Sequence, residues 1–408
     1  MVDLNAISAL LERREPGHAL PQALYNSPDV LEFDMAAIFA RSWLLVGFDV
    51  ELPKTGAWMA VDVGEWPVVL TRHRTGDIKA FHNTCRHRGS RICKPGKGAA
   101  ARLVCPYHRW TYDLSGELAH APRMGDDFDV SDHRLAPVHI QNVGGALYVC
   151  LANDPPPLDD FAAALEPMLA PHNLSHAKLA FESTLIERGN WKLVMENARE
   201  CYHCATSHPE LSRAFPTFVK AHFDFGEDPA QIHFAERLAA AGLPTGTFDG
   251  EGWQISRFML NAPVKTFSMD GEFSVKRLMC DVEGGDIGSL RWANDPNNFV
   301  HATADQLVMF QVMPVGPRES VVTTKWLVHE DAVEGVDYDI ESLTRLWTLT
   351  NLQDRDLVEN NQAGVNSPAY VPGPYSTEAE ALAISFADWY CAKARDFLAR
   401  PGAGMSGS

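Results

Sequence analysis

Two short segments of the sequence each pair a cysteine with a histidine. Cys85 and His87 are separated by one residue, and Cys105 and His108 are separated by two. A [2Fe–2S] cluster with mixed ligands takes two thiolates on one iron and two imidazoles on the other. Glycines between the pairs, such as Gly89, let the backbone bend closely around a cofactor. The two pairs therefore predict a cluster of this kind, held by two loops.

Two other interpretations of these residues are possible. The interpretation that needs no metal is a pair of free cysteines with surface histidines. A tetrahedral zinc site is the stronger alternative, because a C-x2-H spacing also suits zinc. Against zinc, the C-x-H spacing places two ligands unusually close together. The segment between the pairs is also rich in Gly and Lys and does not resemble a zinc-finger helix.

A second set of ligand types lies in the segment NWKLVMENARECYHCATSHPEL. We expect a helix from Trp191 to about Ala205, so that Glu200 and His203, three residues apart, share one face. His208 follows five residues after His203. Because Pro209 disfavours helical geometry at the residue before it, the chain should bend there and return His208 to the side of His203.

A carboxylate for this set is predicted on a long helix from about 338 to 361. Asp354 falls on the same face as the apolar residues Trp347 and Val358, and a carboxylate on a buried face needs a partner or a metal. Two imidazoles and one carboxylate with open positions form the triad of O2-activating non-haem Fe(II) enzymes. Considered one at a time, Asp354 is more simply explained by a buried salt bridge, and His203 and His208 are more simply explained as ordinary core histidines. Together they favour iron.

Two further cysteines flank His203. Cys201 and Cys204 form a C-x-x-C motif, for which a redox disulfide is possible. We expect that the two small side chains simply pack beside the histidine, and we assign them no role. Without an export signal, the remaining thiols are also expected to be reduced unless a metal holds them.

The pattern of apolar runs and turn residues changes twice along the sequence, and it predicts an α+β protein. A helical segment is expected over 1–44, and short β runs broken by turns over 45–152 predict a small antiparallel-β domain. A stiff connector, Asp154–Pro157, lies at the start of the third region, 153–408. This region is expected to form an antiparallel sheet surrounded by helices and to carry the mononuclear iron. The N-terminal segment is expected to pack on it. Residues 243–253 (LPTGTFDGEGW) have the character of a lid or an insertion.

Charge and hydrophobicity exclude some classes of function. The 408 residues carry a formal net charge of −18, with a pI of about 5.3, so a surface that binds nucleic acid is not expected. The N-terminus has no apolar region typical of a signal peptide, and the longest apolar run, 146–152, is too short to cross a bilayer. We therefore expect a cytoplasmic protein without a membrane partner.

The cluster motif resembles that of a known family. The C-x-H-R-G segment and the C-P-Y-H-x-W-x-Y-D-L-x-G segment are similar to the Rieske domain of ring-hydroxylating and demethylating oxygenases. Respiratory Rieske proteins have an additional cysteine pair where this chain has Ser90 and Tyr107. The family's iron motif, acid-x2-His-x4-His with a late aspartate, matches Glu200, His203, His208 and Asp354. The resemblance extends from the first helix to Gly364, and it implies a Rieske cluster and a separate mononuclear Fe(II).

One departure narrows the resemblance. The acid before the first histidine is more often Asp in the family, and Glu200 resembles the quaternary-ammonium branch, which acts on carnitine, glycine betaine and proline betaine. The sequence is most similar to the proline betaine (stachydrine) demethylating type. The resemblance implies oxidative N-demethylation with release of formaldehyde, using O2 and electrons from NAD(P)H through a separate flavin and iron–sulfur reductase.

The resemblance also implies an assembly and a route for electrons. The subunits are expected to form a head-to-tail homotrimer, in which Glu200 bridges His203 and His108 of a neighbouring subunit. An aromatic cage should hold the quaternary ammonium by cation–π attraction, and we choose Phe258 and Trp292 for it. The alternatives are a Rieske oxygenase that hydroxylates aromatic rings or O-demethylates, and a Rieske electron carrier, which would lack the mononuclear iron.

Overall fold

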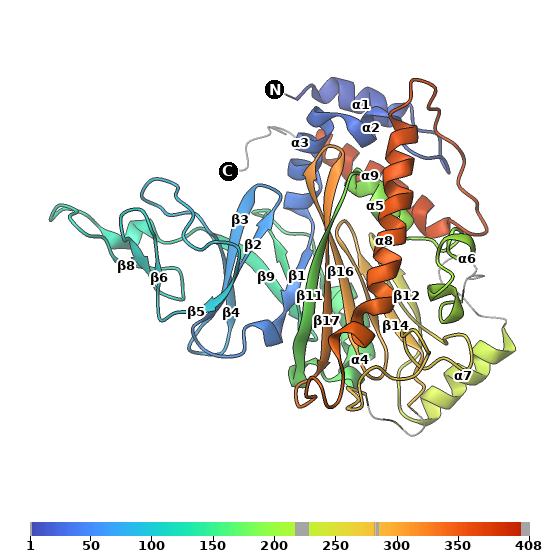
Figure 1. The fold of residues 1–408 in the computed structure, drawn as a ribbon. Helices are drawn as coiled ribbons and strands as arrows, with labels where there is room; N and C mark the ends of the chain where they lie inside the picture. Colours follow the sequence, from blue (N-terminus) through green and yellow to red (C-terminus); the bar gives the residue numbers. More distant parts are fainter. Residues whose placement is uncertain (1, 217–227, 281, 283–284, 401–408) are drawn as a thin grey trace. The chain divides into compact units, whose positions relative to one another are not determined.

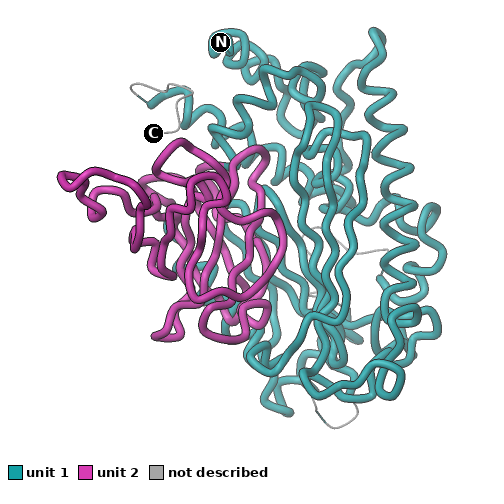
Figure 2. The backbone as a smooth tube through the Cα atoms, turned by 60° about the vertical axis from the view of Figure 1, so that its left-hand side comes forward, with its two compact units in different colours: residues 1–39, 157–408 teal, residues 40–156 magenta. Residues whose placement is uncertain are grey.

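The computed structural model describes the whole chain except residues 1, 217–227, 281, 283–284 and 401–408. The chain forms two compact units, a larger one of residues 1–39 and 157–408 and a smaller one of residues 40–156 (Figure 2). The expected limits of the β domain, 45 and 152, lie just inside the smaller unit, and the three-part division stays a prediction. The predicted α+β class is confirmed. In the described ranges, no helix combines the length and apolar character that a bilayer span requires.

The smaller unit is built from two antiparallel sheets. A seven-stranded sheet has the order β1-β10-β9-β4-β3-β2-β5, and a three-stranded sheet has the order β6-β7-β8. A two-residue turn of Gly144 and Gly145, both at positive φ, joins β9 to β10 as the twist of a tight hairpin requires. The strands are β1 (Leu44–Phe48), β2 (Ala57–Val63), β3 (Trp66–Arg72), β4 (Ile78–His82), β5 (Gly96–Ala99), β6 (Leu103–Val104), β7 (Thr111–Tyr112), β8 (Leu118–His120), β9 (Pro137–Val143) and β10 (Ala146–Cys150).

The larger unit contains a seven-stranded sheet with helices against it (Figure 1). All neighbouring strands pair antiparallel, in the order β11-β17-β16-β15-β14-β13-β12. The strands are β11 (Ala177–Glu187), β12 (Gly246–Gly250), β13 (Trp253–Phe258), β14 (Ser289–Asn294), β15 (Asn298–Ala302), β16 (Leu307–Gly316) and β17 (Glu319–His329).

The helices of this unit come from both of its chain segments, 1–39 and 157–408. They are α1 (Leu4–Glu12), α2 (Ala23–Asn26), α3 (Pro28–Ala37), α4 (Asp159–Leu169), α5 (Trp191–Asn197), α6 (Cys204–Ser207), α7 (Pro229–Ala240), α8 (Ile340–Val365) and α9 (Ala381–Leu398). The N-terminal helices α1 and α3 both contact α9. The long helix α8 runs beside β11 (Figure 1) and buries Leu343, Leu346 and Trp347 in a core cluster with Val308 and Phe310 of β16.

Two expected elements differ in the structure. Residues 246–258 form the hairpin β12–β13 at the edge of the sheet, so the segment expected to be a lid is largely sheet. The helix expected over 191–205 stops at Asn197. Continuing it would require a bond from the N–H of Tyr202 to the carbonyl of Ala198. The Glu200 carboxylate accepts from that N–H, and Arg291 donates to that carbonyl, so side chains replace the helical bond.

Candidate metal centres

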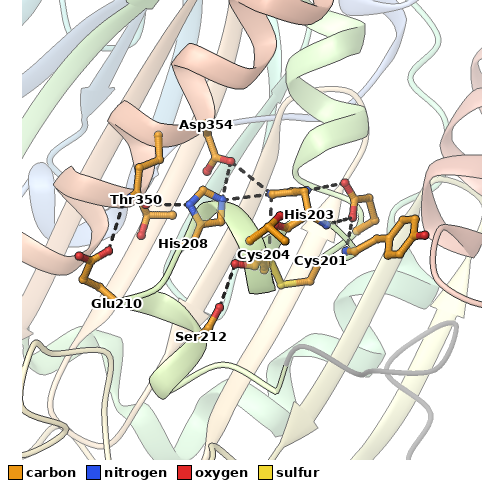
Figure 3. A network of polar contacts seen from close by, with 12 residues as sticks. Cys201, His203, Cys204, His208, Glu210, Ser212, Thr350 and Asp354 are labelled. Carbon is orange, nitrogen blue, oxygen red and sulfur yellow. Dashed lines mark hydrogen bonds and ion pairs between the residues drawn. A yellow bond between two sulfur atoms is a disulfide. The ribbon is translucent and has the colours of Figure 1, made fainter.

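Three predicted ligands converge in the larger unit although they come from distant segments. His203 precedes the short helix α6, His208 follows it, and Asp354 lies on α8 (Figure 3). The two Nε2 atoms are 3.1 Å apart. Oδ1 of Asp354 lies 2.9 Å from Nε2 of His208 and 3.4 Å from Nε2 of His203. The expected bend before Pro209 is present, because His208 has left the helical region, with φ −126° and ψ 70°.

Hydrogen bonds on the far side of each imidazole fix the direction of its lone pair. Nδ1 of His203 is 2.5 Å from a Glu200 carboxylate oxygen, and Nδ1 of His208 is 2.8 Å from the amide oxygen of Gln353. The amide nitrogen of Gln353 donates to Glu210 at 3.1 Å, so the oxygen is the end that faces His208. Each Nδ1 is therefore the donor, and each Nε2 lone pair faces the other and Asp354.

This arrangement fits a metal ion. Three lone pairs about 3 Å apart repel one another unless a cation lies among them, and ligand atoms about 2.1 Å from a metal at right angles have this separation. Among the described residues, the ion-pair partners of Asp354 are the two histidines, so a salt bridge with Lys or Arg does not explain its position. Two imidazoles and one carboxylate on one side of an ion leave the remaining positions open, as in the facial triad.

The electrostatics of the site also favour a cation. Burial disfavours protonation of His203, but hydrogen bonds to Asp354 and Glu200 outweigh it and raise its pKa to about 9. Burial likewise opposes ionisation of Asp354, yet its hydrogen bonds to His203 and His208 hold the pKa of the carboxyl below its ordinary value. The acids around His203 therefore create a negative potential where the three ligand atoms meet.

A disulfide lies beside these ligands. Cys201 and Cys204, expected to be reduced and merely packed, are joined to one another (Figure 3). The Cys204 sulfur is 3.9 Å from Nε2 of His203, close enough that a free thiolate would be a further possible ligand. In the disulfide that thiolate is not available, and the nitrogen and oxygen ligands remain.

A small cavity of about 70 Å³ opens onto the three ligands. Its aromatic wall consists of Phe299 stacked on Phe310 at 4.4 Å, with Trp347 edge-on to Phe310 at 4.9 Å and Phe215 nearby. On the same sheet face, His301 stacks on Trp347 at 5.3 Å. The wall is therefore largely apolar, with π faces available to a ligand.

The two aromatic residues chosen for the substrate cage do not line this cavity. Trp292 pairs with Val300, so strand alternation turns it away from the face that carries Phe299 and His301. Phe258 is fully buried behind Phe215 and His301, at ring distances of 5.4 and 6.3 Å. Neither residue lines this cavity, because face and depth depend on strand register, which sequence composition does not reveal. Their role in a substrate cage stays a prediction.

In the smaller unit, the two Cys/His pairs occupy two loops of similar shape. The N–H of Cys85 donates to the Ser90 carbonyl at 2.8 Å, and the N–H of Cys105 donates to the Trp110 carbonyl at 2.8 Å. The fourth residue after each cysteine, Gly89 or Arg109, has positive φ and returns a bond to the cysteine carbonyl. The loops therefore turn back in the same way, and each presents a cysteine and a histidine.

The side chains of these loops gather as a pair of thiols and a pair of imidazoles. Nδ1 of His87 is 3.1 Å from Nδ1 of His108, while Cys85 and Cys105 are both buried and interact with one another. The Tyr112 hydroxyl lies 3.4 Å from the Cys85 sulfur. One thiol pair and one imidazole pair fit a cluster with two thiolates on one iron and two imidazoles on the other. A hydroxyl donor to sulfur is a group that tunes the cluster's potential.

Comparison with known proteins matches a segment of each compact unit to a family model. Residues 42–140 match the family model of the Rieske [2Fe-2S] domain, and residues 176–395 match that of the ring hydroxylating alpha subunit catalytic domain. The chain is 44% identical to the glycine betaine monooxygenase oxygenase subunit of Chromohalobacter salexigens, over 95% of this chain and 88% of that protein. It is 42% identical to the subunit of the same name from Pseudomonas aeruginosa, over 94% of this chain and 91% of that protein.

Solved structures share the fold. The quaternary ammonium Rieske monooxygenase CntA superposes with a TM-score of 0.73 at 20% identity, covering 94% of this chain and 97% of that one. Naphthalene 1,2-dioxygenase from Rhodococcus sp. gives a TM-score of 0.70 at 17% identity, covering 97% and 99%. These identities are low, so both likenesses concern the arrangement of the elements only.

Proposed function

The chain belongs to the Rieske ring-hydroxylating oxygenase alpha subunits, and from that premise we propose that it oxidatively N-demethylates a small quaternary ammonium betaine. As a Rieske non-haem iron monooxygenase, it carries a Rieske [2Fe–2S] cluster and a mononuclear iron. The observation that carries the proposal is the aromatic cavity that opens onto His203, His208 and Asp354.

We assign the ligands as follows. Cys85, His87, Cys105 and His108 hold the cluster, and His203, His208 and Asp354 hold the mononuclear iron. When bound, the cluster stores an electron and the iron supplies the activation of O2. Glu200 and Gln353 keep both iron-binding imidazoles in the tautomer that presents Nε2. By family resemblance, Glu200 is also the proposed link to His108 of a neighbouring subunit.

The cavity wall supports recognition of a quaternary ammonium. Such a cation has no N–H with which to form a hydrogen bond, so aromatic faces are the groups that attract it. Phe299, Phe310 and Trp347 supply those faces within the same cavity as the iron ligands. An N-methyl group held against this wall lies near the open side of the triad. Replacing one of its hydrogens by hydroxyl gives a hemiaminal, which releases formaldehyde and leaves the tertiary amine.

The size of the cavity and the relatives together point to a small betaine. About 70 Å³ of free space holds only a few water-sized groups, which suits glycine betaine better than a fused aromatic substrate. The high identity to two glycine betaine monooxygenase subunits extends over nearly the whole chain. Proline betaine, expected from the sequence, carries the same quaternary nitrogen and carboxylate on a ring, and carnitine is longer. We therefore rank glycine betaine first and proline betaine second.

Oxygenase subunits of this family work with a separate reductase and form oligomers. We propose in addition that electrons come from NAD(P)H through a flavin and iron–sulfur reductase, and that the oligomer is a homotrimer. Relatives such as the glycine betaine and carnitine monooxygenases are named as oxygenase subunits, which supports a separate subunit that delivers the electrons.

The test is formaldehyde release by the reconstituted system. The iron-loaded chain, a ferredoxin–NADH reductase and O2 are incubated with glycine betaine, proline betaine, carnitine and benzoate in turn, and formaldehyde and NADH are measured. We expect stoichiometric formaldehyde with a betaine and none with the Asp354→Ala variant. Oxidation of benzoate without formaldehyde would instead identify a ring hydroxylase. A chain that binds cluster iron but no further iron would be an electron carrier.

A further inference from the structure

Two buried guanidinium groups line the same cavity as the candidate iron ligands. Arg199 follows α5 and Arg291 lies on β14, and they are 6% and 3% exposed. Charged groups are rarely buried to this extent unless they are paired or serve a ligand. Neither arginine was singled out by spacing or motif, and neither contacts His203, His208 or Asp354 in the described hydrogen bonds.

The structure holds both arginines in defined positions. Arg291 donates through Nη1 to the amide oxygen of Gln254 at 3.3 Å and through Nη2 to the carbonyl of Ala198 at 3.1 Å. Its register partner on β15 is His301, so it shares the sheet face of the aromatic wall. Arg199 forms an ion pair through Nη2 with Asp295. The other terminal nitrogen of Arg199, Nη1, is buried and has no hydrogen-bond partner among the described residues.

The two guanidinium groups share an acidic neighbour. Asp295 forms the ion pair with Arg199, and the same carboxylate also interacts electrostatically with Arg291. Buried charges are costly unless nearby charges compensate them. Burial and the neighbouring charge of Arg199 lower the pKa of Arg291 to about 9, against the opposing effect of Asp295. Burial, reinforced by Arg291, also lowers the pKa of His301, so that imidazole is neutral and adds no charge. The cavity is thus lined by two buried guanidinium groups, and one of them has a buried donor without a partner among the described residues.

We propose that Arg199 and Arg291 form the subsite for the carboxylate of the substrate, with Nη1 of Arg199 as a hydrogen-bond donor to it. The proposal rests on the function proposed above and names what that site selects, a zwitterion with a carboxylate rather than a simple quaternary ammonium cation. A bound carboxylate brings a negative charge beside the two guanidinium groups and an acceptor for Nη1 of Arg199. The aromatic wall and the two arginines then recognise the two ends of one small molecule.

The proposed subsite gives the site a means of discrimination. Choline has the trimethylammonium group of glycine betaine but a hydroxyl in place of the carboxylate. In the site it would offer the guanidinium groups no negative charge, and those groups would repel the cation of choline. Recognition by the aromatic wall alone would not separate the two molecules, because their cationic ends are identical.

The experiment compares the binding of glycine betaine and choline to the iron-loaded, cluster-containing chain without O2, by calorimetry. Wild type should bind glycine betaine more tightly than choline. Arg199→Gln, which keeps a donor but removes the charge, should weaken glycine betaine about 10- to 100-fold, as expected for loss of a charge-assisted hydrogen bond. The affinity for choline should stay the same or increase. Arg199→Lys, which retains the charge, should lose less than Arg199→Gln.

A matched control separates recognition from general destabilisation. Arg257 on β13 is also 3% exposed, but it donates to the Met168 carbonyl and to His172 and does not line the cavity. Arg257→Gln removes a buried guanidinium of the same kind, and it should leave the preference for glycine betaine over choline at the wild-type ratio.

Three results would overturn the subsite, and one other concerns the function itself. Wild type that binds choline at least as tightly as glycine betaine has no carboxylate recognition. Equal weakening of both ligands by Arg199→Gln assigns Arg199 to support of the fold. If wild type releases formaldehyde from no betaine, the proposed function fails. If formaldehyde is released but Arg199→Gln discriminates as wild type does, only the carboxylate subsite fails.

Discussion

Gln353 provides a sharp test of the proposed iron site, because it contacts the proposed ligand His208 and is not itself a proposed ligand. Its amide oxygen accepts from Nδ1 of His208 at 2.8 Å, and its amide nitrogen donates to Glu210 at 3.1 Å. Gln353→Leu preserves most of the volume and removes both bonds. The His208 ring is 1% exposed, so water cannot readily replace the lost acceptor.

The expected consequence is a change of tautomer. Without Gln353, the proton of His208 is better placed on Nε2, where it donates to Asp354 at 2.9 Å. Iron binding must then displace that proton. Loss of a hydrogen bond that orients a metal-binding imidazole typically weakens the metal 10- to 100-fold, about 1.4 to 2.7 kcal/mol. Gln353→Leu should therefore lose mononuclear iron at a chelator concentration 10- to 100-fold lower than wild type.

The assay is equilibrium dialysis against a series of chelator concentrations, with iron counted per chain and the visible absorbance of the cluster as an internal reference. The matched control is Gln362→Leu. This glutamine is also on α8 and is 2% exposed, but it accepts from the N–H of Asn190 at 2.8 Å and donates to Asn366. The control should reduce stability without changing iron affinity. If Gln353→Leu retains iron like wild type, packing alone orients His208 and the reasoning is refuted.

Four further predictions concern single side chains. Cys105→Ala should abolish the visible absorbance of the cluster, since it removes one of four proposed ligands, and an unchanged spectrum would refute the assignment. Asp354→Ala should lose the mononuclear iron and keep that absorbance; retention of full activity would mean that another carboxylate is the ligand. Glu200→Gln should keep both metals but slow the reoxidation of pre-reduced enzyme by O2 in single turnover, because the variant lacks the charge proposed to link two imidazoles, and wild-type rates would exclude that link. Burial raises the pKa of Glu196 to about 7, so the folded chain binds this proton more tightly than the unfolded chain and stability should fall by about 3 kcal/mol as the pH rises from 4.5 to 7. Glu196→Gln should remove that fall in unfolding measured by denaturant, and an unchanged pH dependence would show that Glu196 ionises normally.

The sequence alone determined the chemistry at each centre. Cys85 and His87, or Glu200 and His203, are neighbours along the chain, so short loops bring them together almost regardless of the rest of the fold. Pro209 likewise indicates a local bend by steric exclusion, and the structure shows His208 outside the helix. Asp354 was found through the periodicity of α8, which is again a local pattern. These predictions required only residue type and short-range spacing.

The tertiary structure decided what surrounds those ligands. Strand register places Arg291, Phe299 and Phe310 on the cavity face and turns Trp292 away. A shift of one residue would exchange the two sets, and nothing local in β14 or β15 excludes that shift. Arg291 also ends α5 by binding the carbonyl of Ala198, from a strand more than ninety residues along the chain. The surroundings of the ligands depend on contacts between distant segments, whose pairing only the assembled sheet and α8 determine.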